Sequence, residues 1–232
     1  MKTIPGVLEK TKLAIQTKVA KLYEMGIQNV QLDICDGFYT KEPTWPYSTE
    51  SGEEDVIQIA EGEDGLPYWQ DISYELDLMV RDASKNFALF TSLGAGRLTF
   101  HLDAELGEEE SDFADFLAVI DRDTKENIEI GLAILPTTEI KDLEKFMSNI
   151  DYVQCMGIDE VGSQGIPFDA KVVEKVKELR EAYPDLEIQV DGGVNLENAK
   201  SLKEAGADRI IVGSAIWKSQ NIIETIENFE NI

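Results

Sequence analysis

The sequence predicts a single (β/α)8 barrel of the α/β class, with residues 1–232 forming one domain. Eight strand-like segments alternate with periodic apolar segments of helical length along the whole chain. This alternation favours parallel strands joined by right-handed crossovers. A doubly wound open sheet is the competing interpretation, but it usually has a glycine-rich first turn that this sequence does not contain.

The predicted strands are short runs dominated by apolar residues. In chain order they are Thr3–Leu8, Asn29–Ile34, Tyr74–Met79, Arg97–Leu102, Ile128–Ile134, Tyr152–Met156, Leu186–Val190 and Arg209–Val212. Apolar residues at helical spacing predict helices over Lys12–Met25, Asp112–Ile120, Ala170–Arg180, Leu196–Ala205 and Ile222–Phe229. Pro184 prevents the third helix from continuing, whereas Asn195 caps the fourth and Gly206 ends it.

One stretch, residues 41–70, does not fit the alternation. It is acidic, rich in proline and glycine, and carries Trp45 and Trp69. Because it follows the second strand, we expect it to rise from the face of the barrel that carries the site. It is either a lid or subunit contact, or a solvated insertion.

The composition limits the partners of the chain. Its 232 residues include 21 basic and 46 acidic side chains, a net charge of −25. Such a field repels nucleic acid and anionic membranes, so we expect neither as a partner, and a bound phosphate must rely on local donors. No leader or apolar span is visible, and the two cysteines, Cys35 and Cys155, are expected to be unpaired thiols of a cytoplasmic protein.

Two predicted strands carry a carboxylate close to their carboxyl ends. The stretches Val30–Gly37 and Leu186–Gly193 both finish in an Asp-Gly turn. Since side chains alternate along a strand, Gln31 and Asp33 point to one face, and so do Gln189 and Asp191. In a barrel that face is the interior, where Asp33 and Asp191 would oppose each other across a bound molecule, as proton-shuttling chemistry requires.

Two further titratable residues are predicted to lie near these acids. Asp77 on the third strand is a third inward carboxylate, and His101, the single histidine, ends the fourth strand. A lone histidine is either structural or catalytic. Three converging carboxylates require a cation, a shared proton or a polar ligand.

Glycine-rich loops follow the last three strands. They are Gly162-Ser163-Gln164-Gly165, Gly192-Gly193 and Gly213-Ser214, the last of which opens a short helical turn. Barrels commonly hold a phosphate between the loops after strands seven and eight. The sequence therefore predicts a phosphate site on these loops.

Several motifs together resemble the ribulose-phosphate 3-epimerase family along nearly the whole chain. They are Pro5-Gly6-Val7-Leu8, Gln31-Leu32-Asp33-Ile34-Cys35-Asp36-Gly37-Phe38, Leu76-Asp77-Leu78-Met79-Val80, Thr99-Phe100-His101-Leu102-Asp103-Ala104, Gly131-Leu132-Ala133-Ile134-Leu135-Pro136-Thr137, Val190-Asp191-Gly192-Gly193-Val194 and Gly213-Ser214-Ala215-Ile216. The resemblance implies a barrel that binds a pentulose phosphate, with Asp33 and Asp191 as acid and base on either side of the inverted carbon. It also implies a divalent metal that polarises the ketone, substrate contacts from His101 and Met156, and a homo-oligomer, either a dimer or a hexamer.

The departures from the family pattern concentrate at the implied metal site. Gln31 and Asp77 stand where the family has histidines, and Gly6 replaces a substrate-contacting serine. The implied ligands become Gln31, Asp33, Asp77 and Asp191, an all-oxygen set that favours magnesium, manganese or calcium over zinc or iron. Alternatively no metal binds, and a protonated carboxyl group, His101 or Gln31 donates to the oxyanion.

Three functions remain open from the sequence. The first is an epimerase that inverts C3 of a ketopentose phosphate through an enediolate. The second is a related barrel isomerase, lyase or aldolase acting on another ketose phosphate, although no inward lysine is evident. The third is a sugar-phosphate-binding protein without turnover.

Overall fold

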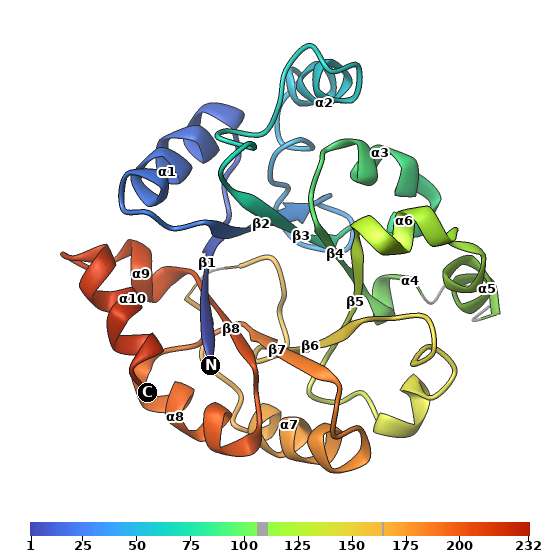
Figure 1. Cartoon of the computed structure of the whole chain (residues 1–232), viewed down its shortest axis with the longest axis vertical. Coiled ribbons are helices and arrows are strands. Elements are labelled where there is room, and N and C mark those ends of the chain that lie inside the picture. Colours follow the sequence, from blue (N-terminus) through green and yellow to red (C-terminus); the bar gives the residue numbers. More distant parts are fainter. Residues whose placement is uncertain (106–110, 164) are drawn as a thin grey trace.

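The strands of the chain form a closed, all-parallel barrel in the order β1 to β8 (Figure 1). The computed structural model describes residues 1–105, 111–163 and 165–232. The strands are β1 (Lys2–Val7), β2 (Asn29–Cys35), β3 (Ser73–Met79), β4 (Arg97–His101), β5 (Glu129–Ile134), β6 (Tyr152–Met156), β7 (Glu187–Asp191) and β8 (Arg209–Val212). All eight predicted strands are confirmed, and the (β/α)8 barrel is confirmed with them.

Helices surround this barrel as an outer ring (Figure 1). They are α1 (Lys12–Glu24), α2 (Gly52–Ala60), α3 (Phe87–Ser92), α4 (Leu102–Glu105), α5 (Ser111–Val119), α6 (Arg122–Asn127), α7 (Lys171–Ala182), α8 (Leu196–Ala205), α9 (Ser214–Trp217) and α10 (Ile222–Glu230), with 3-10 turns η1 (Ala83–Asn86) and η2 (Ile140–Leu143). The five predicted helices correspond to α1, α5, α7, α8 and α10. At α8 the predicted ends are confirmed: Asn195 accepts from the N–H of Asn198, and Gly206 ends the helix with φ +106°.

The stretch 41–70 keeps the alternation that we expected it to break, because it contains α2. This helix lies outside the ring of the other helices, at the top of Figure 1. Val56 and Ile59 are buried on its inner face, and Trp45, which is 1% exposed, donates through Nε1 to Asp55 Oδ2 at 2.9 Å. Trp69 is 62% exposed. The stretch is thus a packed crossover, and its role as a lid or subunit contact stays a prediction.

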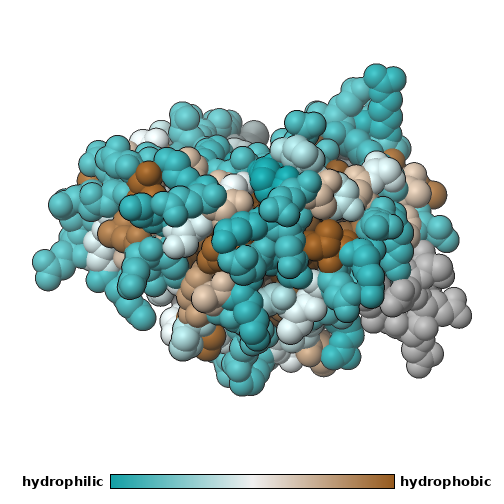
Figure 2. Space-filling model, turned by 90° about the horizontal axis from the view of Figure 1, so that it is seen from below, coloured by the Kyte–Doolittle hydropathy of each residue, from teal (hydrophilic) through white to brown (hydrophobic). Residues whose placement is uncertain are grey.

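The main apolar core lies between the barrel and the helices. Outward side chains such as Leu32, Leu76 and Leu98 are buried there, as expected for parallel strands covered by helices. Both cysteines are free and buried. The surface in Figure 2 is mostly hydrophilic, in keeping with the net charge of −25. Within the described ranges, no helix is long and apolar enough to cross a membrane.

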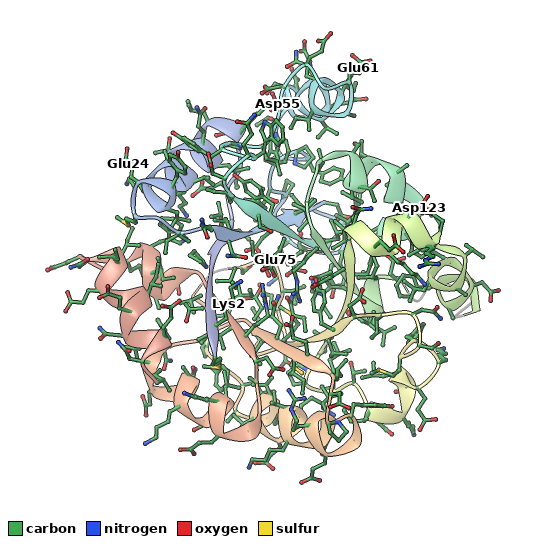
Figure 3. The ribbon with its side chains drawn as sticks, in the orientation of Figure 1. Lys2, Glu24, Asp55, Glu61, Glu75 and Asp123 are labelled. Atoms are coloured by element: carbon green, nitrogen blue, oxygen red, sulfur yellow. The ribbon has the colours of Figure 1, made fainter. Side chains whose placement is uncertain are left out.

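The inside of the barrel is polar at its bottom, where many barrels carry Val, Ile and Leu. Glu75 lies near the barrel axis (Figure 3) and pairs with the guanidinium of Arg209. Arg97 donates to Glu187 Oε1 at 2.6 Å, and its guanidinium carbon lies 3.8 Å from the centre of the Tyr152 ring. We call Glu75, Arg97, Arg209 and Glu187 the arginine layer.

A tyrosine side chain fills the space inside the barrel next to β5. A β-carbon on Gly131 would overlap the ring of Tyr152, so a residue without a side chain is required at position 131. The Tyr152 hydroxyl forms a hydrogen bond of 2.7 Å with Thr99 Oγ1. This ring and the arginine layer close the bottom of the barrel, and the functional groups lie above them.

Candidate active site

Asp33 and Asp191 converge at the carboxyl ends of β2 and β7. Asp33 points inward because it shares a face with Gln31, and Asp191 is the last residue of β7. The side-chain amide of Gln31 connects them, since its Nε2 donates to Asp33 Oδ1 at 2.9 Å and to Asp191 Oδ2 at 2.8 Å. The structure therefore brings the two expected acids into one compartment.

Asp77 joins this pair as a third carboxylate. One oxygen of each of Asp33, Asp77 and Asp191 lies within 4.8 Å of the others. Asp77 is fully buried. Its Oδ1 lies 2.7 Å from His101 Nε2, and its Oδ2 accepts from Gln154 Nε2 at 3.0 Å. Both oxygens of this carboxylate thus have partners inside the barrel.

His101 is buried beside Asp77 and beneath Tyr39. It is 1% exposed, and the Tyr39 hydroxyl lies 3.4 Å from its Nδ1 while donating to the carboxylate of Asp103 at 2.8 Å. The side chain is absent from the described lining of the cavity, so its expected contact with substrate stays a prediction. It forms a buried pair with Asp77 instead.

The carboxylates perturb one another's protonation. Burial raises the pKa of Asp33 well above its ordinary value, and the charges of Asp191 and Asp77 raise it further. Burial and the charge of Asp77 raise the pKa of Asp191 to about 7, against the lowering effect of the Gln31 hydrogen bond. Burial alone would lower the pKa of His101, but the charge and hydrogen bond of Asp77 leave it above its ordinary value. The raised pKa values of Asp33 and Asp191 both favour the protonated form of these carboxyl groups, which a general acid requires.

A cavity opens above the acids at the carboxyl ends of the strands. Asp33 and Asp191 line it together with most of the predicted binding residues. These are Met156, Gly162, Ser163, Gly192, Gly193, Gly213 and Ser214. Gln164 lies outside the described residues. Gln31 and Asp77 lie below the lining, fully buried.

Part of the lining was not predicted from the sequence. It comprises Gly6, Leu8, Met79, Ile158, Val194 and Ile211, whereas Gly165 belongs to the predicted phosphate loop and also lines the cavity. The position of Gly6, one residue before the end of β1, and that of Met79, at the end of β3, were signals that could have found them. At Gly6 a β-carbon would lie 3.0 Å from Ile211 Cγ2, so the serine of the family pattern would be crowded here.

Bare backbone faces the cavity at Gly192 and Gly193. Both have positive φ values, +104° and +66°. A β-carbon would lie 2.7 Å from Ile158 Cγ1 at the first position and 2.9 Å from Phe168 Cα at the second. Only glycine fits both the conformation and the space, and it leaves the backbone open to a ligand.

A lysine missed by the sequence interpretation lies at the rim of this cavity. Of the described lining residues none is basic. The Lys218 ammonium nitrogen, however, lies 3.5 Å from the place a β-carbon would occupy on Gly165. Lys218 follows α9, which Trp217 anchors to β1 by donating to the Gly6 carbonyl at 2.7 Å. This lysine is a candidate contact for an anionic group.

The three carboxylates fit a hard divalent cation. Their oxygens are close enough to share one ion, and an all-oxygen set favours magnesium, manganese or calcium. Gln31, the fourth expected ligand, turns its N–H groups rather than its oxygen toward Asp33 and Asp191. Its role as a ligand stays a prediction.

Comparison with known proteins identifies a family. A model described as the ribulose-phosphate 3 epimerase family matches residues 2–217. The chain is 29% identical over 158 residues to a ribulose-phosphate 3-epimerase of Schizosaccharomyces pombe, covering 68% of this chain and 65% of that protein. It is 24% identical over 223 residues to the Bacillus subtilis ribulose-phosphate 3-epimerase, covering 94% and 92%.

Solved structures share the fold at low identity. The structure of KGPDC from Streptococcus mutans in complex with D-R5P has a TM-score of 0.68 and 14% identity, covering 99% of this chain and 95% of that one. A 3-hexulose-6-phosphate synthase has a TM-score of 0.66 and 16% identity, covering 100% and 99%. At these identities the likeness shows the barrel fold alone.

Proposed function

This chain belongs to the ribulose-phosphate 3-epimerase family, and on that premise we propose that it inverts C3 of a ketopentose phosphate through an enediolate. The observation that carries the proposal is the pairing of Asp33 and Asp191. Both carboxylates line one cavity and share a donor, Gln31, with contacts of 2.9 and 2.8 Å. Acid and base groups placed on two sides of one carbon are what inversion requires.

The proton transfers follow from this arrangement. The ionised member of the pair removes the proton from C3, and the protonated member delivers a proton to the opposite face. The raised pKa of Asp33 and the pKa of about 7 for Asp191 support this assignment, because both shifts favour a protonated member of the pair. For the reverse reaction the two carboxyl groups exchange roles.

The negative charge that forms on the ketone oxygen requires stabilisation. A divalent cation held by Asp33, Asp77 and Asp191 would polarise this oxygen and supply several kcal/mol of stabilisation. The chain itself offers one hydrogen-bond donor at the same place, the protonated carboxyl group of the pair, because both N–H groups of the Gln31 amide already donate to Asp33 and Asp191.

The phosphate is assigned to the glycine loops at the other side of the cavity. Gly192, Gly193 and Gly213 line it with backbone that no side chain covers, and Lys218 lies at its rim. Local donors are necessary because the net charge of −25 repels a sugar phosphate at long range. The substrate would therefore bind with its phosphate on the loops and its ketone toward the acids.

Exchange of the C3 proton of ribulose 5-phosphate with deuterium oxide tests the proposal directly. Proton NMR should show loss of the C3 signal when the protein is present. The measurement is made with added magnesium, with added manganese and after treatment with a chelator. The Asp33→Asn/Asp191→Asn double variant is the matched control. A folded protein that exchanges no C3 proton under any of these conditions would refute the proposed activity.

A second candidate, a sugar-phosphate-binding protein without turnover, is favoured by one observation. Both oxygens of Asp77 are already engaged, by His101 and by Gln154, at the position where the family pattern has a metal-binding histidine. Calorimetric binding of ribulose 5-phosphate without exchange would support it. Exchange or cleavage with another ketose phosphate would instead indicate a related isomerase or lyase, although no described lysine is buried in the barrel.

A further inference from the structure

Three buried glutamines connect the arginine layer at the bottom of the barrel to the carboxylates at its top. Gln31, Gln154 and Gln189 are all 0% exposed. They come from β2, β6 and β7, and each points inward. We call these three residues the glutamine chain.

Arg209 sets the orientation of the glutamine chain at its lower end. A guanidinium carries only donors, and Arg209 is buried and also paired with Glu75. Its Nε donates to Gln189 Oε1 at 2.8 Å. Gln189 must therefore turn its carbonyl oxygen toward Arg209 and its NH2 group away from it.

The orientation of Gln189 also fixes the side-chain amides of Gln154 and Gln31. Gln189 Nε2 lies 2.8 Å from Gln154 Oε1 and 3.3 Å from Gln31 Oε1, so both oxygens act as acceptors. Their NH2 groups then face upward. Gln154 donates to Asp77 Oδ2 at 3.0 Å, while Gln31 donates to Asp33 and Asp191.

Reversing one amide would break contacts at both of its ends. With Gln31 reversed, its oxygen would face the carboxylates of Asp33 and Asp191, and its NH2 group would face that of Gln189. A buried polar group left without a partner destabilises the folded protein, and no solvent reaches these side chains to replace the lost hydrogen bonds. The network therefore admits one orientation of each amide.

From this geometry we propose that Arg209, through Gln189, fixes Gln31 as a hydrogen-bond donor to the acid pair. Gln31 is then a positioning residue rather than a cation ligand, because its oxygen is turned down toward Gln189. A divalent cation would then be bound by the three carboxylates alone. The inference rests on the proposed function for its catalytic meaning, but the amide orientation itself stands on the contacts alone.

Gln31→Glu separates the two roles of this residue. A glutamate offers oxygens to a cation but no N–H to Asp33 and Asp191. If Gln31 is a donor, kcat for C3 exchange should fall at least about tenfold, the lower limit for groups that orient reacting residues, while KM for ribulose 5-phosphate changes less than about threefold. The exposed Gln16→Glu adds the same charge outside the barrel and should leave both constants unchanged. Unchanged kcat in a folded Gln31→Glu protein would overturn the proposal.

Gln189→Glu tests the fixed orientation without relying on turnover. It keeps an acceptor for Arg209 but removes the NH2 group that faces Gln31 and Gln154. In the parent protein, the side-chain amide protons of Gln31 and Gln154 should exchange slowly with solvent when followed by NMR, and in Gln189→Glu at least about tenfold faster. Fast exchange in the parent, or equal exchange in both proteins, would overturn the proposal. Slow exchange with no epimerase activity would instead sustain the orientation and reject the proposed function.

Discussion

Replacing Asp77 with asparagine should lower the pKa of His101, because the charge and the hydrogen bond of Asp77 are the largest of the effects that raise it. The two side chains meet at 2.7 Å, with exposed fractions of 1% for His101 and 0% for Asp77. A hydrogen bond to a charged group is worth about 1.5–3 kcal/mol, and one pKa unit corresponds to about 1.36 kcal/mol. Asp77→Asn should therefore lower the pKa of His101 by about one to two units. Burial, which lowers this pKa, would then be opposed only by the charges of Asp103 and Asp191.

The assay benefits from the presence of a single histidine in the chain. With 13C-labelled histidine, the imidazole gives one set of NMR signals, and its pKa can be measured on chelator-treated protein. Asp103→Asn is a matched control, because Asp103 is exposed and accepts from Tyr39 rather than from the imidazole. It should lower the pKa by less than half as much. An unchanged or raised pKa in Asp77→Asn would refute the reasoning.

The same substitution should change how the stability depends on pH. In the parent, the raised pKa of His101 means that the folded state binds this proton more tightly than the unfolded state. The resulting stabilisation is complete below the ordinary value of 6.5 and disappears as the pH rises through the folded pKa. In Asp77→Asn the stabilising contribution of His101 should be smaller, because the folded state then binds the proton less tightly. Urea unfolding of both proteins across this pH range would measure the difference.

Four further predictions follow from the site and the barrel. Asp33→Asn and Asp191→Asn should each slow C3 proton exchange at least about 100-fold, measured by NMR. Magnesium or manganese at about 100 times its Kd should stabilise the protein by about 2.7 kcal/mol, and thus raise Tm by about 5–10 °C in a calorimetric scan; an unchanged Tm would reject the cation site. Lys218→Met should weaken binding of inorganic phosphate about two- to fivefold by calorimetry at low salt, whereas Lys200→Met, exposed on α8, should not. Gly131→Ala should destabilise the protein by about 1–3 kcal/mol in urea, because the new methyl group would overlap a ring inside the barrel.

The strands were predictable because each is a compact apolar run between polar segments. The longer helices were predictable from their spacing, and α8 from its caps. Shorter elements, α3 and α6 among them, have six residues each, too few to show a clear period. Helix α2 was missed because the prolines and glycines of the stretch 41–70 suggested an irregular loop, although Val56 and Ile59 mark its buried face.

The acids of the site could be predicted because each precedes a turn at the end of an inward-facing pattern. The partners that hold them could not be assigned in the same way. Gln31 was expected to present an oxygen, and only the contacts below it show that its N–H groups face Asp33 and Asp191. The placement of Lys218 depends on how two loops distant in sequence meet, which no local pattern records.

The closed bottom of the barrel limits how a ligand can enter and leave the cavity. Glu75, Arg97 and Tyr152 are buried inside the bottom of the barrel, so a ligand cannot pass through it. A ligand of the cavity must therefore enter and leave at the carboxyl ends of the strands. Under the proposed function, substrate and product epimers would enter and leave by the same opening, so that accumulated product should compete with substrate for the cavity.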